Sequence, residues 1–206
     1  MALINADGAR RIAEAINSAE RKTSGEIVAV VANSSATYAY IPLLYASLIA
    51  LFVPWPLTFF TWMRLDLVYL IQLVVFFVLA LTFLYRPIRY ALVPASIKRA
   101  QAHKRAVEQF LVQNLHTTDG RTGALVFVSE AERYAEIIAD SGIRSKVADG
   151  TWKTIVDRLT EQIGNGNADD GFVEAVTALG QLLAQHFPPG SNDPDQLPNH
   201  LIVLES

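Results

Sequence analysis

The sequence predicts an α/β fold, in which a small mixed β-sheet covered by helices is interrupted after its first strand by a two-helix transmembrane hairpin. The first observation is a gap in the charge pattern: residues 27–63 and 67–85 contain no Asp, Glu, Lys or Arg. The second is that short β-branched apolar runs alternate with helical patterns on both sides of this gap, as in α/β domains. The 206 residues therefore predict one small domain with a membrane insertion.

The charge-free segment has the length of two membrane spans. Leu67–Leu84 contains 18 residues, of which only Gln72 and Thr82 are clearly non-apolar. At about 1.5 Å per residue it covers most of a hydrocarbon core of roughly 30 Å. A soluble core helix of this length would carry a polar stripe, and this run carries none. Ile41–Thr61 is also long enough, and the short link 61–66 joins the two spans into a hairpin.

Gln72 is the one strongly polar side chain in the second span. Its amide could bond across to another helix, or it could pair within its own hairpin with Tyr45, Ser47 or Thr58. Of these two alternatives, the sequence favours pairing within the hairpin.

Basic residues after the second span predict the orientation of the protein. The segment from Arg86 to Arg105 holds six Lys or Arg residues, and no acid occurs before Glu108. The positive-inside rule places this segment in the cytoplasm. An even number of spans then returns residues 1–36 to the same side. The first residues contain no apolar core of a secretion signal. We expect a multi-pass inner-membrane protein with both termini in the cytoplasm.

The flanks of the hairpin predict the parts of one domain. Residues 7–22 have helical apolar spacing, and Glu26–Ala32 is a continuous apolar run typical of a buried strand. After the hairpin, a helix is predicted from Pro94 to about Leu115, followed by strands at Gly123–Ser129 and Ala135–Asp140. The short link between these two strands predicts an antiparallel pair, whereas the first two strands are predicted parallel.

Two further helices are predicted, one around residues 152–163 and one around 172–183, with a short edge strand at Leu201–Leu204. The predicted organisation has four parts. They are the first part of the domain (1–36), the transmembrane hairpin (37–85, with spans at about 41–61 and 67–84), the second part (86–187) and a Pro/Gly/Asn-rich tail (188–206).

These elements resemble the TPM domain. The resemblance rests on Arg121–Ile143 (RTGALVFVSEAERYAEIIADSGI), on Asp149, and on Gly164–Phe172 (GNGNADDGF), while Thr23–Ile27 (TSGEI) fits the membrane-embedded bacterial branch. It covers residues 1–36 and about 95–187 and implies a three-layer sandwich. The family includes a thylakoid-lumen acid phosphatase, a photosystem II repair factor and an auxiliary protein of nematode acetylcholine receptors. Some members bind a divalent metal or hydrolyse phosphate esters.

The chain departs from the family pattern where that chemistry would lie. Arg121-Thr122-Gly123 stands in place of Asp-Asn-Gly, so a base replaces an acid. Ala148-Asp149 keeps the acid of Thr-Asp. Gly166–Gly171 matches Gly-Asp-Tyr-Asp-x-Gly and keeps only the second acid, as Asp169. With two of four carboxylates missing, the resemblance implies the fold more strongly than the chemistry.

The predicted topology brings acidic residues to the sheet edge where the first two strands start, an edge expected to point away from the bilayer. Glu26, Asp140 and Asp149 are the candidate ligands there for Ca²⁺ or another divalent cation. Alternatively, Asp149 caps the following helix and Glu26 is a solvated strand end. We favour this alternative because Arg121 and Arg144 would compete for the same carboxylates.

Other classes of chemistry find little support. Asp169 and Asp170 are interpreted as N-caps of the last helix, at the opposite edge. The chain has no cysteine, and its four histidines show neither metal-ligand spacing nor a Ser/His/Asp pattern. No phosphate-binding loop occurs, and no small-molecule substrate is evident. The net charge of −3 argues against nucleic-acid binding.

We therefore expect a membrane-anchored cytoplasmic module that binds or helps maintain a membrane protein complex, with the lipid bilayer and a membrane protein as partners. Two alternatives stay open: a divalent-metal-binding module, and a phosphatase-like hydrolase at the sheet edge. A role without catalysis is favoured, since the acids are depleted and no nucleophile is apparent.

Overall fold

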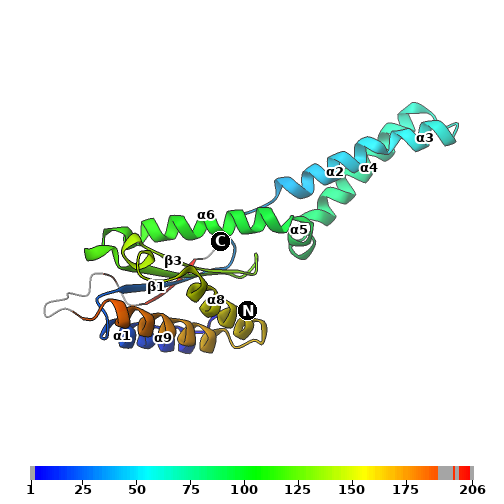
Figure 1. Ribbon diagram of the computed structural model, residues 1–206. Helices are drawn as coiled ribbons and strands as arrows, with labels where there is room; N and C mark the ends of the chain where they lie inside the picture. The colour runs from blue at the N-terminus through cyan, green and yellow to red at the C-terminus, as the bar shows by residue number, and fades with distance from the viewer. Residues whose placement is uncertain (1–2, 190–196, 198–199, 205–206) are drawn as a thin grey trace. The chain divides into compact units, whose positions relative to one another are not determined.

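A four-stranded mixed sheet in the order β3-β2-β1-β4 forms the centre of the computed structural model (Figure 1). β1 (Glu26–Ala32) pairs in parallel with β2 (Gly123–Ser129) and β4 (Leu201–Leu204), and β2 pairs antiparallel with β3 (Tyr134–Ala139). Every residue of β1 and β2 is buried, as expected of strands covered on both faces. The mixed sheet and the short edge strand at 201–204 are thus confirmed.

The structure describes residues 3–189, 197 and 200–204, without the side chain of Asp149. Part of the predicted tail therefore lies outside the described residues. Contacts between residues divide the chain into two units. Residues 1–35 and 99–206 form one of them, which we call the α/β unit. Residues 36–98 form the other, the helical unit.

Helices cover both faces of the sheet in the α/β unit (Figure 1). On one face lie α1 (Ala6–Glu20), α8 (Asp149–Gly164) and α9 (Ala168–His186). The other face is covered by α6 (Ala95–Val112), which begins at the end of the helical unit. The larger core cluster lies under α1, α8 and α9, and the smaller one lies between α6 and the sheet. The three-layer arrangement follows from strands that are apolar on both faces.

The sequence did not predict several short elements. α6 ends before the predicted Leu115, because Asn114 adopts a left-handed backbone (φ 57°) that stops the helix. Leu115 starts a turn of 3-10 helix, η1 (Leu115–Thr117), and is fully buried there. The remaining additions are η2 (Asp119–Arg121), α5 (Arg86–Leu92) and α7 (Ser141–Arg144).

The helical unit is built from the apolar hairpin. α2 (Tyr40–Phe52) and α3 (Pro54–Phe60) form one apolar stretch with a break at Val53, where Pro54 cannot donate a backbone hydrogen bond. α4 (Leu65–Leu84) lies beside α2. Tyr40–Phe60 and Leu65–Leu84 are both long and apolar enough to cross a membrane, and little of either is buried within the described structure.

Candidate functional site

The sheet edge at the start of β1 and β2 is where the sequence placed acidic residues together. Glu26 is the register partner of Gly123, and the carbonyl of Gly123 accepts the N–H of Asp140 at 2.9 Å. Glu26 and Asp140 thus lie on either side of the first residue of β2. This much of the predicted grouping is present.

Both carboxylate oxygens of Asp140 already have partners. Oδ1 accepts the backbone N–H of Ser141 at 2.6 Å, which caps α7, and Oδ2 lies 3.5 Å from Nη1 of Arg121. The same Nη1 donates to the carbonyl of His116 at 2.5 Å. Arg121 adopts a left-handed backbone with φ 57°. The guanidinium of Arg121 thus lies beside the carboxylate of Asp140, where it would compete with a cation as the sequence analysis expected.

Two details of the alternative interpretation are wrong. Glu26 is only 7% exposed, so it is a buried residue rather than a solvated strand end. The N-cap of α8 is Ala148, and Asp149 is the first helical residue. The side chain of Asp149 lies outside the described part. Among the residues described, no three His, Cys, Asp or Glu side chains gather as metal ligands do. A cation site at Glu26, Asp140 and Asp149 stays a prediction.

A calcium titration checks that prediction. We expect no saturable shift of the amide signals of residues 25–27 and 140–151 at micromolar calcium, because Arg121 holds a carboxylate that the cation would need. Replacing the base by an acid, Arg121→Asp, is the matched variant and should raise calcium affinity. Saturable micromolar binding by the unchanged protein, lost in Asp149→Ala, would contradict this expectation and would favour a metal-binding module.

Asp169 and Asp170 do not cap α9, contrary to the sequence interpretation. Asn167 is the N-cap, and the two acids lie in the first helical turn. The positive end of the helix dipole stabilises carboxylates at this position. Asp170 accepts from Nη2 of Arg11 at 2.5 Å. A Cβ placed on Gly8 would overlap the carboxylate of Asp169, so α1 and α9 approach closely there. Both acids connect the two helices.

A buried polar cluster lies at the opposite end of β1 and β2. Glu132 is 7% exposed, and its carboxylate accepts the N–H of Ser35 at 3.1 Å and the hydroxyl of Ser129 at 2.5 Å. The hydroxyls of Ser35 and Ser129 are 2.8 Å apart. The cluster fixes the chain that leaves β1 against the β2–β3 turn. Sequence reasoning missed it, although Glu132 in a tight turn beside a strand-end serine was a usable signal.

A second group of polar side chains that the sequence analysis did not identify joins α6 to β3. Nδ1 of His103 lies 2.9 Å from Oε2 of Glu136, and the hydroxyl of Tyr134 donates to the same oxygen at 3.0 Å. Burial, and then the charge of Glu136, raise the pKa of Tyr134 well above its usual value. Tyr134 therefore stays protonated at neutral pH and remains a donor. This group positions α6 on the sheet.

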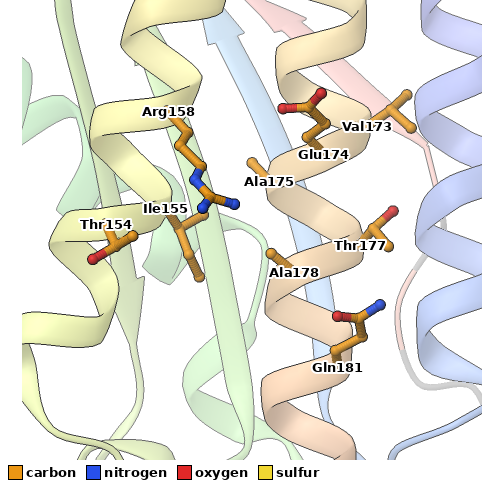
Figure 2. A pocket seen from close by; sticks show the side chains of 9 residues that line it. All are labelled: Thr154, Ile155, Arg158, Val173, Glu174, Ala175, Thr177, Ala178 and Gln181. Atoms are coloured by element: carbon orange, nitrogen blue, oxygen red, sulfur yellow. The ribbon is translucent and has the colours of Figure 1, made fainter.

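A groove lies between α8 and α9 in the α/β unit. It has a volume of about 380 Å³, and Figure 2 shows Arg158 reaching from α8 into the space between the helices. Arg158 makes no ion pair with any described residue, although Glu174 stands on the facing helix. Apolar side chains and a few uncharged polar ones complete the groove. The other lining residues are Thr154, Ile155, Val173, Ala175, Thr177, Ala178 and Gln181.

Comparisons with known proteins agree with this fold. Residues 88–182 match the model of the TPM domain. The NMR structure of BA42 protein from the psychrophilic bacterium Bizionia argentinensis is similar, with a TM-score of 0.62 and 21% identity over 98% of this chain and 95% of that chain. At this identity the likeness concerns the fold. No curated protein matches the chain.

Proposed function

We propose that this protein, which carries a TPM domain over residues 88–182, is a membrane-anchored module whose TPM domain lies in the cytoplasm and binds a membrane protein complex. The observation that carries the proposal is the apolar hairpin, inserted into the chain between β1 and α6. Two helices of spanning length would hold the α/β unit beside the bilayer, so that its binding partner would also be found there. A domain held at the membrane in this way is in reach of membrane proteins, which supports a role in binding or maintaining a membrane protein complex.

The exposure of the hairpin supports insertion into lipid. Its large apolar side chains are mostly exposed, for example Trp55 at 81%, Phe59 at 84% and Leu81 at 72%. Monomeric soluble proteins rarely expose contiguous apolar patches larger than a few hundred Å². Trp55 and Tyr85 stand near the ends of the apolar stretches, where aromatic residues anchor at the interface. Insertion into the hydrocarbon core of a bilayer is the simplest way to remove this apolar surface from water.

Topology reporters test the anchoring. After alkaline carbonate extraction the full-length protein should remain in the membrane pellet, because hairpin side chains are solvated by lipid. Fusions at Met1 and after Ser206 should both be active with a cytoplasmic reporter and inactive with a periplasmic one, since basic residues follow the second span. Extraction into the supernatant, or a periplasm-active fusion at either end, would overturn this part of the proposal.

The α8–α9 groove is where we place the partner. Arg158 offers a guanidinium without an ion pair to any described residue, in a groove whose lining also includes the apolar Ile155 and Ala178. A polypeptide segment that presents one carboxylate beside apolar side chains would fit both features, since Arg–carboxylate pairs are strong and directional. The partner is therefore expected to contribute an acidic residue at this contact.

Photo-crosslinking in native membranes tests the groove. A photoreactive residue at Thr177, inside the groove, should form an adduct with a membrane protein that mass spectrometry identifies. The same residue at Glu161, exposed on α8 outside the groove lining, is the matched control and should form little adduct. Arg158→Glu should reduce the Thr177 adduct about tenfold or more, because a charge reversal places two carboxylates together. Equal adducts at both positions would argue against the groove.

A further inference from the structure

One face of the hairpin carries a hollow of about 510 Å³. α4 contributes Tyr69, Gln72, Leu73 and Phe76, which follow one another at i, i+3, i+4 and i+7 and so share one helix face. α2 contributes the exposed residues Ser47 and Leu51, together with Ala50, which is buried. The small exposed side chain of Ser47 leaves room for another helix to come close. The hollow is therefore a candidate helix-packing surface.

The amide of Gln72 lies at this hollow without a hydrogen bond to any described residue. Two of the three hydroxyl groups expected to pair with it are engaged elsewhere: Ser47 donates to the carbonyl of Leu43 and Thr58 to that of Pro54, each at 2.8 Å. No hydrogen bond joins the third, that of Tyr45, to Gln72 in the described part of the chain. The pairing within the hairpin that the sequence favoured is thus not formed. Inside a bilayer no water is present to satisfy an amide, so Gln72 requires a partner from outside the hairpin.

We propose that the partner is a second copy of this chain, and that the hairpins form a parallel dimer through the Tyr69–Phe76 face of α4 with Gln72 at its centre. This inference rests on the proposed membrane insertion. Copies inserted in the same orientation are related by a two-fold axis along the membrane normal, and this axis brings equal residues together at equal depth.

The chemistry of an amide fits its own copy. Each Gln72 offers N–H donors and a carbonyl acceptor, so two of them can form reciprocal hydrogen bonds in which each carbonyl accepts one N–H from the other copy. Gln72 follows the first residue of α4 by seven positions, which places it about 10 Å along the span and inside the hydrocarbon core. A different protein would need a matching polar group at this same depth, whereas a second copy supplies one by symmetry.

Cysteine crosslinking of the full-length protein in native membranes tests the dimer, and the natural chain has no cysteine to interfere. Leu73 and Val74 are neighbours in depth and are similarly exposed, at 54% and 53%. Leu73 lines the hollow and Val74 does not. Under mild oxidation, Leu73→Cys should give a band of twice the monomer mass, and Val74→Cys should give several-fold less. Equal crosslinking at both positions, or none at either, would overturn the proposal.

Replacement of the amide provides a second readout. Gln72→Leu, combined with Leu73→Cys, should lower the dimer fraction, with a shift of about three- to tenfold in the dimerisation constant in detergent micelles. Gln72→Asn keeps an amide and should retain part of the dimer. An unchanged constant in Gln72→Leu would overturn the role of Gln72, as would a photo-crosslink from position 72 that reaches only a different protein. Carbonate extraction distinguishes a failed dimer from a failed membrane anchor.

Discussion

A protein in which residues 1–36 are joined by a short flexible linker to residues 95–206 should be soluble and should unfold in a single cooperative transition. Residues 95–206 alone should show no such transition. β1 explains the difference, because it lies between β2 and β4 and is buried on both faces. Burial of Ile27, Val28, Val30 and Val31 alone contributes about 6–12 kcal/mol. This is comparable to the whole stability of an ordinary domain.

Urea unfolding followed by tryptophan fluorescence is the measurement for this expectation. Trp55 and Trp62 are removed with the hairpin, so Trp152 of α8 becomes the sole tryptophan of the fusion protein. It packs against the larger core cluster and reports on that cluster. A matched control is the full-length protein in detergent, monitored by circular dichroism. If residues 95–206 alone unfold cooperatively at the same urea concentration as the fusion protein, the two flanks do not form one domain.

Glu132→Ala should destabilise the fusion protein by about 3 kcal/mol. The carboxylate is buried and accepts the N–H of Ser35 and the hydroxyl of Ser129, a side chain with no exposed surface. Removing an ionised acceptor leaves buried donors unsatisfied, which costs more than the hydrogen bonds themselves contribute. The free energy of unfolding, from the urea midpoint and slope, measures this loss.

Two variants in the same turn make the result specific. Glu132→Gln keeps the size and one acceptor oxygen, so it should lose less, about 1 kcal/mol. Glu130→Ala removes a carboxylate that is exposed, and its effect should stay within about 0.5 kcal/mol. If Glu130→Ala and Glu132→Ala were equally destabilised, turn propensity rather than the buried cluster would explain the effect.

Local patterns in the sequence predicted most of the elements. β1 and β2 have the predicted boundaries, and β3 and α4 differ from the prediction by one or two residues. These segments are largely apolar, and such a pattern can be recognised without knowing which part of the chain each segment packs against. The short elements α5 and α7 were missed, because four to seven residues carry too few apolar positions to show a period.

The candidate sites were less predictable, because they depend on atoms from distant parts of the chain. The sequence placed Glu26 and Asp140 at the same sheet edge, because the crossover between β1 and β2 predicted a parallel pair and the short β2–β3 link an antiparallel one. It could not predict that Arg11, 159 positions earlier in the sequence, would bind Asp170. Nor could it identify the buried pairing of Glu132 with Ser35, on the other side of the hairpin in the sequence.

The sequence by itself determined the two apolar spans, the buried strands and the mixed direction of the sheet, because length, hydropathy and link length constrain each of these locally. Only the tertiary structure decided what polar side chains bind. It paired Arg11 with Asp170, placed Arg158 in a groove without an ion pair to any described residue, and left Gln72 without a partner in its own hairpin. Hydrogen bonds act over about 3 Å, and such distances between residues far apart in sequence are set only when the whole chain packs.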